Sequence, residues 1–290
     1  MIENIGIIGA GQMGCGIAQV CVVAGYNVFL SDLSQEALHH SLEIIGHSLE
    51  RQVARNKLSA KEKEEAMGRL HSFTGLREFK TCHLVIEAVT ENEDVKKSIF
   101  KELIPHLNPK CLLASNTSSI SITALGRATD RPDKFMGMHF MNPVPVMQLV
   151  ELIRGMATSN ATFTSFQEIV KRLGKQSAVS EDYPGFIVNR ILMPMINEAV
   201  YALFEGVGTI ESIDKAMHLG TNQPMGPLEL ADLIGLDTCA AIMEVLYQGY
   251  GESKYKPCPL LVKYVEAGWL GHKTGRGFYD YKGEQPVPTR

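Results

Sequence analysis

The sequence predicts an α/β domain, built on a mostly parallel sheet with helices on both faces, followed by a smaller all-helical domain. Three observations support this prediction. Residues 4–31 contain no Asp, Glu, Lys or Arg. Short apolar runs then alternate with helical patterns as far as the Tyr183-Pro-Gly185 segment, and beyond it the apolar residues follow the helical period alone. We therefore expect two domains, residues 1–184 and residues 185–290.

The composition is that of a globular protein. The 290 residues are 45% hydrophobic and 21% charged. A net charge of -4 gives no reason to expect nucleic acid or an anionic membrane surface as a partner. The six cysteines form no C-x-x-C pair. We therefore predict buried, reduced thiols in a cytoplasmic protein without a metal site.

The uncharged stretch at residues 4–31 is long enough to be mistaken for a membrane span. Its six glycines and its Asn and Gln side chains would be poorly tolerated in a lipid bilayer. A buried strand, a buried helix and a second buried strand explain the stretch better, because a parallel sheet is covered on both faces. This assignment supplies the first βαβ unit of the predicted domain.

A glycine-rich loop follows the first apolar run. Gly9, Gly11 and Gly14 have the G-x-G-x-x-G spacing of a turn that joins a strand to a helix whose free N–H groups face a pyrophosphate. In such a loop the second glycine lets the backbone approach the phosphates, and the third lets helix and strand pack closely. Taken alone, the spacing fits a mere tight turn equally well. The loop residues expected to bind a cofactor are Gly9, Gly11, Gln12, Met13 and Gly14.

The second apolar run, Tyr26–Leu30, leads to Asp32. This aspartate lies about 20 residues beyond the loop, where a carboxylate binds the ribose hydroxyls of NAD. The same carboxylate would repel the 2′-phosphate of NADP. The alternative is an aspartate that merely precedes a helix beginning near Ser34. Because strand, loop, helix, strand and acid agree, we predict a Rossmann-type doubly wound sheet that binds NAD.

Two consecutive helices interrupt the strand–helix alternation. The first is predicted to run to about Lys57, and Ser59-Ala-Lys-Glu62 has the pattern of a capping box that starts the second. We treat residues 38–70 as an inserted helical pair. Its tip carries Arg51 and Arg55 beside Lys57. Basic side chains there suit the anionic end of a substrate, and a solvated helix face is the alternative.

Polar residues follow two further predicted strands. The strand at residues 82–89 is followed by Glu91 and Lys96, and open α/β sheets bind ligands at the carboxyl ends of their strands. The next helix is expected at residues 94–107. The strand after it, residues 112–117, runs into Ser118 and Ser119, and four small polar residues in succession suit the wall of a binding site better than a turn.

A histidine and a glutamate flank the Asn142-Pro-Val-Pro145 segment. Prolines exclude a helix there and favour a turn. If the flanking apolar segments pair as antiparallel strands, His139 lies opposite Glu151. A catalytic histidine needs this arrangement, with one ring nitrogen on the substrate and the other fixed by a carboxylate. The alternative is a buried histidine that merely satisfies its hydrogen bonds. A last strand is expected at residues 177–180.

The second domain begins with a helix, residues 186–204, that is apolar around most of its circumference. Such a helix is central or lies at a subunit interface. Asn189 and Arg190 are polar exceptions near its start. Two further helices are predicted at residues 210–219 and 227–234, and a glycine-rich basic loop at Gly271–Tyr279.

A cofactor loop with a carboxylate-backed histidine indicates hydride transfer coupled to proton transfer at a hydroxyl. Over essentially its whole length the chain resembles the L-3-hydroxyacyl-CoA dehydrogenase family. The segments that carry the resemblance are GAGQMG at Gly9, SNTSS at Ser115, HFMNPVPVM at His139, DYPGFIVNR at Asp182, MGPLELADLIGLD at Met225 and KTGRGFY at Lys273.

The resemblance implies roles for the polar residues. His139 would be the general base for the 3-hydroxyl group, and the general acid in the reducing direction. Glu151 would orient His139 and stabilise its charged form. Ser118, Asn142 and Asn189 would hydrogen-bond the substrate or keep cofactor and histidine aligned.

The remaining implied roles concern NAD and coenzyme A. Asp32 would hold the adenosine ribose, while Glu91, Lys96, Ser118 and Lys273 would complete the NAD site. Ser118 and the basic tip would meet the CoA part of an acyl-CoA substrate, although the lysine-rich tip of the family reads Arg55-Asn-Lys57 here. The family and the apolar second domain also suggest a homodimer.

Two other functions fit parts of the same pattern. Sugar-acid dehydrogenases of the L-gulonate type share the glycine loop and the HFMNP-like segment, but they need no basic patch at the helical tip. A non-catalytic NAD-binding structural protein, such as some lens crystallins, would need no His139–Glu151 pair. Both features therefore favour a 3-hydroxyacyl-CoA dehydrogenase.

Overall fold

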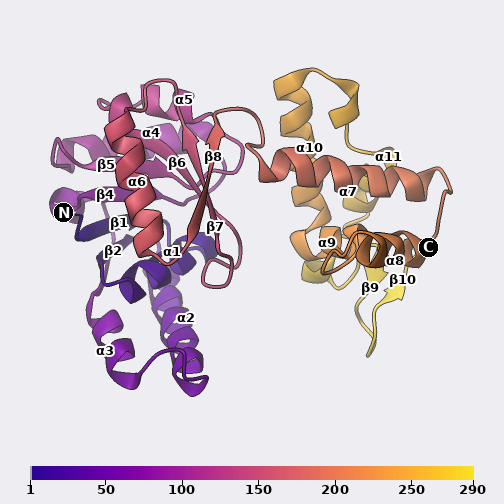
Figure 1. Cartoon of the computed structure of the whole chain (residues 1–290), viewed down its shortest axis with the longest axis horizontal. Helices are drawn as coiled ribbons and strands as arrows, with labels where there is room; N and C mark the ends of the chain where they lie inside the picture. The colour runs from indigo at the N-terminus through magenta and orange to yellow at the C-terminus, as the bar shows by residue number, and fades with distance from the viewer. Residues whose placement is uncertain (1) are drawn as a thin grey trace. The chain divides into compact units, whose positions relative to one another are not determined.

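The computed structural model describes residues 2–290, which divide into two compact units. The first unit extends to Phe186 and the second begins at Ile187. Each unit has its own hydrophobic core, so we describe them separately. Figure 1 shows the sheet in the first unit and the helices of the second.

The first unit is built on a single eight-stranded sheet with the order β3-β2-β1-β4-β5-β6-β7-β8. The first six strands in this order are parallel, β7 is antiparallel to β6, and β8 is parallel to β7. The mostly parallel sheet is therefore confirmed. The strands are β1 Asn4–Ile8, β2 Asn27–Ser31, β3 Leu70–Phe73, β4 Leu84–Glu87, β5 Leu112–Ser115, β6 Phe135–Phe140, β7 Leu149–Arg154 and β8 Gln176–Glu181.

Helices cover both faces of this sheet, as predicted. One buried cluster joins the strands to α1, α2 and α6, and a second cluster joins them to α4 and α5. The uncharged stretch forms β1, α1 and β2, which explains why it tolerates no charge. The helices of this unit are α1 Gln12–Val23, α2 Gln35–Ala54, α3 Ala60–Gly68, α4 Glu93–Leu103, α5 Ile122–Arg127 and α6 Asn160–Arg172.

The predicted helical pair is α2 and α3, and the capping box at its second helix is confirmed. The pair connects β2 to β3, a short edge strand that the sequence did not predict because it alternates poorly and is only half-buried. The first helix stops at Ala54 instead of Lys57. Asn56 takes a left-handed conformation with φ 55°, and the Lys57 N–H then donates to the Gln52 carbonyl.

The helix predicted to extend to residue 107 also ends early. α4 stops at Leu103 and continues only as a 3₁₀ turn over Ile104–His106. Pro105 lies within that turn, and a proline has no N–H with which to continue an α-helix. The break therefore occurs at Pro105, and Pro109 lies beyond it.

The second unit is helical, as predicted, and also carries a small two-stranded ribbon. Its first helix begins at Val188 and not at residue 186, because Gly185 and Phe186 have positive φ angles. The elements are α7 Val188–Phe204, α8 Ile210–Gly220, α9 Pro227–Ile234, α10 Leu236–Tyr250, α11 Pro259–Glu266, β9 Tyr279–Asp280 and β10 Val287–Pro288.

Within residues 2–290, no helix combines the length and the apolar character needed to cross a membrane. The same residues contain no group of three or more His, Cys, Asp and Glu side chains that could hold a metal ion. All six cysteines are free thiols, and all are buried.

Candidate active site

Each of the three glycines in the loop has a different structural role. Gly9 has φ +104°, and a Cβ there would lie 2.6 Å from the Ala88 carbonyl oxygen. A Cβ on Gly14 would collide with the Gly9 carbonyl oxygen, so the third glycine allows α1 to pack against the turn. A Cβ on Gly11 would meet none of the described atoms within 4 Å. The backbone at Gly11 is thus open to a ligand, as a dinucleotide loop requires.

The N-terminus of α1 is suited to an anion. Gly11 is its N-cap, no side chain of the described residues caps it, and its first turn carries no acid. The loop follows β1, next to β4, where the strand order reverses between the two halves of the sheet. Open α/β sheets bind dinucleotides at this reversal, with the pyrophosphate on the helix N-terminus. The residues present therefore fit NAD.

Asp32, directly after β2, is held by backbone amides. Its Oδ2 accepts the Ala10 N–H at 2.8 Å, and its Oδ1 accepts the Ser34 N–H at 2.9 Å. A carboxylate has about four acceptor positions, so each oxygen can accept a further hydrogen bond from a ribose hydroxyl. The first of these bonds also ties the carboxylate to the glycine loop.

The predicted pairing of His139 and Glu151 is present in the strand register. The two residues lie opposite each other in the antiparallel β6–β7 pair. His139 Nδ1 is 2.7 Å from Glu151 Oε2, and the residues are 8% and 0% exposed. Because Nδ1 faces Glu151, Nε2 is the ring nitrogen left for a substrate. His139 is near the carboxyl end of β6, at the sheet edge that also carries the glycine loop.

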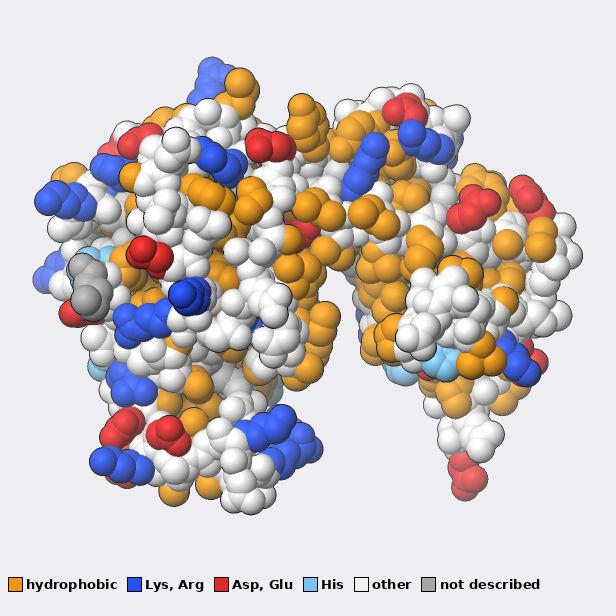
Figure 2. Space-filling model, viewed as in Figure 1, with side chains coloured by type: hydrophobic (Ala, Val, Ile, Leu, Met, Phe, Trp, Pro, Cys, Tyr) orange, Lys and Arg blue, Asp and Glu red, His pale blue; other side chains and the backbone are white. Residues whose placement is uncertain are grey.

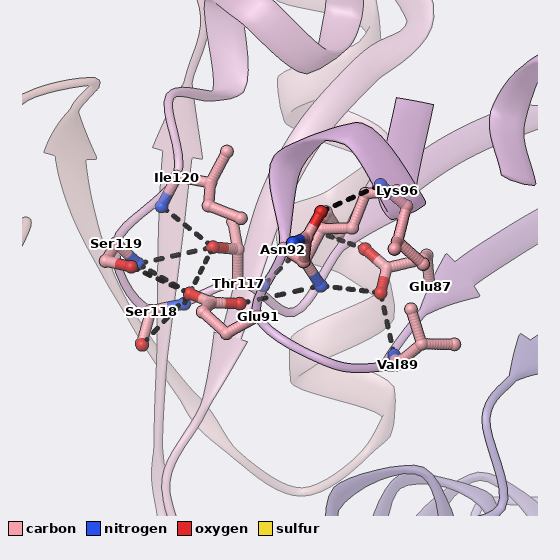
Figure 3. A network of polar contacts seen from close by, with 11 residues as sticks. Glu87, Val89, Glu91, Asn92, Lys96, Thr117, Ser118, Ser119 and Ile120 are labelled. Atoms are coloured by element: carbon pink, nitrogen blue, oxygen red, sulfur yellow. Dashed lines mark hydrogen bonds and ion pairs between the residues drawn. The ribbon is translucent and has the colours of Figure 1, made fainter. Parts of the chain in front are cut away.

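A polar network links the ends of β4 and β5, as Figure 3 shows. The Lys96 ammonium lies 2.6 Å from Glu87 Oε1 and 3.5 Å from Glu91 Oε2. Lys96 is 1% exposed and Glu87 is fully buried. The Lys96 ammonium is thus paired with two carboxylates. We therefore expect Lys96 to affect cofactor binding through its contact with Glu91. Glu87 also accepts the Ser115 hydroxyl at 2.6 Å.

Glu91 accepts hydrogen bonds from the loop that follows β5, residues 116–120, which we call the serine loop. Its Oε1 accepts the hydroxyl of Thr117 at 2.6 Å, the N–H of Ser118 at 2.8 Å and the N–H of Ser119 at 3.0 Å. Partial burial alone would raise the pKa of Glu91. The Thr117 hydroxyl, the Lys96 ammonium and the two serines outweigh that effect and hold the pKa below its usual value.

Sequence reasoning missed two residues that support this edge. Asn116 Oδ1 accepts the Phe140 N–H at 2.9 Å and so joins the end of β5 to the residue after His139. Ser115 joins β5 to β4 through Glu87. Both lie within the polar SNTSS run, whose composition marked the region without assigning these partners. Asn142 is exposed in the connection between β6 and β7.

The other predicted residues lie apart from this cluster in the chain. Asn189 is buried near the start of α7, and Lys273 pairs with Asp237, both within the second unit. Arg51, Arg55 and Lys57 are exposed at the end of α2 and in the connection to α3. Figure 2 shows Lys and Arg side chains gathered at the lower end of the first unit, where Figure 1 places this helical pair.

His139, hydrogen-bonded to Glu151, is a proton-transfer group at the edge of the sheet where the glycine loop fits a dinucleotide. This combination defines a nicotinamide-dependent dehydrogenase that acts on a hydroxyl or carbonyl group. Two family models cover nearly all of the chain. Residues 4–183 match the NAD-binding domain of 3-hydroxyacyl-CoA dehydrogenase, and residues 185–281 match its C-terminal domain. The chain belongs to the 3-hydroxyacyl-CoA dehydrogenase family, and its cofactor is NAD.

Individual relatives agree with this assignment. The chain is 59% identical over 290 residues to a 3-hydroxybutyryl-CoA dehydrogenase of Bradyrhizobium diazoefficiens, covering 100% of this chain and 99% of that protein. It is 50% identical to a probable 3-hydroxybutyryl-CoA dehydrogenase of Bacillus subtilis, covering 97% and 98%. The crystal structure of (S)-3-hydroxybutyryl-CoA dehydrogenase from Ralstonia eutropha superposes with a TM-score of 0.95 at 49% identity, covering 98% and 100% of the two chains.

Proposed function

We propose that the chain interconverts short-chain L-3-hydroxyacyl-CoA and 3-ketoacyl-CoA, with His139 as the general base and acid. The observation that carries this proposal is the 2.7 Å contact between His139 Nδ1 and the fully buried Glu151. In the oxidising direction, His139 Nε2 takes the proton of the 3-hydroxyl as the C3 hydride departs. In the reducing direction, the same nitrogen returns a proton to the alkoxide oxygen.

Glu151 has two tasks in this proposal. It fixes the orientation of the imidazole through Nδ1, so that Nε2 is the basic nitrogen. It also offsets the positive charge that His139 gains with the proton, and this interaction is stronger away from water. Bound NAD supplies the hydride acceptor for oxidation and, as NADH, the hydride donor for reduction.

The serine loop and the basic tip are the proposed substrate contacts. Ser118 receives its position from Glu91, which accepts both its N–H and, at 3.2 Å, its hydroxyl. We assign Ser118, with Asn142 and Asn189, to the substrate oxygens. Arg51, Arg55 and Lys57 are assigned to the phosphates of coenzyme A, because all are exposed cations and phosphate is an anion.

Substrate class is tested by initial rates of NADH oxidation. Acetoacetyl-CoA and longer 3-ketoacyl-CoA compounds are compared with the keto forms of sugar acids. We expect the highest kcat/KM with acetoacetyl-CoA. Turnover of the sugar acids alone would overturn the acyl-CoA assignment, and bound NADH without any turnover would indicate a structural protein.

Cofactor choice is tested at Asp32. Replacing Asp32 with Ala removes the acceptor for the ribose hydroxyls and the charge that repels a 2′-phosphate. We expect weaker NADH binding and a smaller preference for NADH over NADPH, by about tenfold or more, since even one lost charge-assisted hydrogen bond contributes roughly 1.5–3 kcal/mol. An unchanged preference in fluorescence titrations would exclude Asp32 from the ribose site.

We also propose a cytoplasmic homodimer that associates through the second unit. Large apolar side chains are exposed there, among them Ile191 at 66%, Phe204 at 52% and Leu219 at 66%. Sedimentation of the parent and of Ile191→Glu tests the proposal. A dimer that the substitution weakens supports it, and a parent that sediments as a monomer contradicts it.

A further inference from the structure

Phe186, the last residue of the first unit, has a backbone conformation that a phenylalanine rarely adopts. Its φ is +50°, in the left-handed region, and the preceding Gly185 has φ +77°. Glycine takes such angles without cost, but a bulky aromatic residue is strained there. Strain of this kind persists only where the surrounding structure fixes it, and it is concentrated at functional sites.

The strained backbone places the Phe186 ring against the proposed catalytic histidine. The two ring centroids are 5.9 Å apart, and the planes meet at 61° in an edge-to-face arrangement. Phe186 is only 5% exposed and belongs to the buried cluster on the α4–α5 face of the sheet. Aromatic pairs favour this geometry.

Glu151 and Phe186 restrain different features of His139. The hydrogen bond to Glu151 fixes one atom of the imidazole, Nδ1, but this contact alone leaves the ring free to tilt about it. A packed ring beside the imidazole restricts that tilt. Together the two contacts set the direction of Nε2, which must align with the substrate proton.

The segment before Phe186 is anchored at its other end. Asp182 accepts the Ser121 hydroxyl at 2.8 Å, the Ile122 N–H at 2.9 Å and the Thr123 N–H at 2.7 Å. These donors form the first turn of α5, which follows the serine loop directly. The short segment 182–186 is thereby tied to the start of α5 at one end and packs against His139 at the other.

We propose that Phe186 is a positioning residue for His139, held in its strained conformation by the Asp182 anchor. This inference rests on the proposed role of His139. It extends that role by assigning a task to the segment where the two units join. A residue that merely filled the core would need no positive φ, since other phenylalanines of the same cluster have ordinary backbones.

The test compares Phe186→Leu with Phe79→Leu. Phe79 is a matched control, because it is fully buried in the same cluster and has its own edge-to-face partner, Phe73, at 5.2 Å. We expect both variants to melt at lower temperature. Only Phe186→Leu should lose kcat with acetoacetyl-CoA, by about tenfold or more, because small misplacements of a catalytic group are costly. The Kd for NADH should stay within about twofold, as for a contact outside the cofactor site.

A second pair of variants separates the ring from the backbone. Phe186→Gly and Phe186→Ala both remove the ring and should lose kcat equally. The glycine variant should melt at the higher temperature of the two, because alanine is still strained at a positive φ. Should Phe186→Leu fail to fold, Asp182→Asn keeps the ring and weakens its anchor, and we expect a partial loss of kcat with unchanged Kd for NADH.

The proposal is overturned if Phe186→Leu keeps kcat within about threefold of the parent, or if Phe79→Leu loses as much kcat as Phe186→Leu. His139→Gln is measured in the same assay. A normal rate for that variant would refute the role of His139 itself, whereas an inactive His139→Gln beside a fully active Phe186→Leu would refute the role of Phe186 alone.

Discussion

Buried carboxylates have different partners in the two units. In the first unit, Glu87 and Glu151 are fully buried and face Lys96 and His139. In the second, Asp232 is 1% exposed and accepts the N–H groups of Phe278 and Tyr279 and the Tyr281 hydroxyl. Asp214 accepts the N–H groups of Leu228 and Glu229 and the Tyr279 hydroxyl.

This difference suggests that the buried carboxylates of the first unit serve the proposed site, whereas those of the second unit hold chain segments together. Carboxylates that face a lysine or a histidine can offset a positive charge, at the sheet edge where we propose that cofactor and substrate bind. Those of the second unit fasten the C-terminal segment to α8 and α9 with neutral donors, and burial raises the pKa of both Asp214 and Asp232 despite these donors. Removing a first-unit carboxylate should therefore affect activity or local order, and removing a second-unit one should affect stability alone.

The largest effect is expected at His139. The His139→Gln variant keeps a polar side chain but cannot take up the substrate proton. We expect the rate to fall by about 10²- to 10⁴-fold, the usual contribution of general acid–base catalysis, while NADH binding is retained. Steady-state rates and NADH fluorescence check both statements, and turnover within tenfold of the parent would remove His139 from the mechanism.

The next effect concerns the buried Lys96–Glu87 pair. Lys96→Met leaves the fully buried Glu87 without its cation, and breaking such a pair costs about 3–5 kcal/mol of unfolding free energy. The double variant Lys96→Met, Glu87→Gln should recover much of that loss. Urea denaturation measures both. If the single and double variants were equally destabilised, the two charges would not be energetically coupled.

A smaller loss is expected at Asp232. Asp232→Ala leaves two backbone amides and the Tyr281 hydroxyl without their acceptor, at about 1–3 kcal/mol for each buried group left unsatisfied. The exposed Asp94→Ala serves as the control. The folded Asp232→Ala fraction should keep the KM and kcat of the parent. A selective loss of kcat would show that this anchor also supports the chemistry.

The smallest effect is a pH dependence of opposite sign in the two units. The folded-state pKa of Glu91 is lowered, so its stabilising contribution is present above 4.5 and is lost as the pH falls through the folded value. The folded-state pKa of Asp232 is raised from 3.8, so its contribution is largest at low pH and declines as the pH rises through the folded value.

Melting temperatures of the parent, Glu91→Gln and Asp232→Asn between pH 7 and about pH 4 check these signs. The difference in melting temperature between the parent and Glu91→Gln should become smaller as the pH falls. The difference in melting temperature between the parent and Asp232→Asn should become larger over the same pH range. If both differences in melting temperature changed in the same direction with pH, the contrast between the two units would be contradicted.

Much of the first unit was predictable because its signals are local. The glycine loop and Asp32 have a fixed spacing, and the opposition of His139 and Glu151 follows from pairing around a proline-rich turn. The edge strand β3 was not predictable, because its three half-buried residues and one exposed residue show no apolar alternation. The sequence analysis also predicts neither α10 nor α11, at Leu236–Tyr250 and Pro259–Glu266.

The contacts behind the site could not be predicted from spacing. Lys96 was expected at the cofactor, and only the folded chain shows its ammonium between Glu87 and Glu91. The apolar pattern of residues 186–204 predicts Phe186 as the first residue of a helix, whereas α7 begins at Val188. The positive φ of Phe186 has no local sequence signal, and the Asp182 hydrogen bonds that anchor the same segment join residues about 60 positions apart in the chain.

The most direct test of the His139–Glu151 pair is the rate of NADH oxidation by acetoacetyl-CoA in Glu151→Gln. A glutamine keeps the size of the side chain but cannot offset the charge of a protonated imidazole. We expect kcat to fall by about 10²-fold or more while the Kd for NADH is unchanged. A Glu151→Gln variant with kcat within about threefold of the parent would show that the pair does not carry the proton transfer.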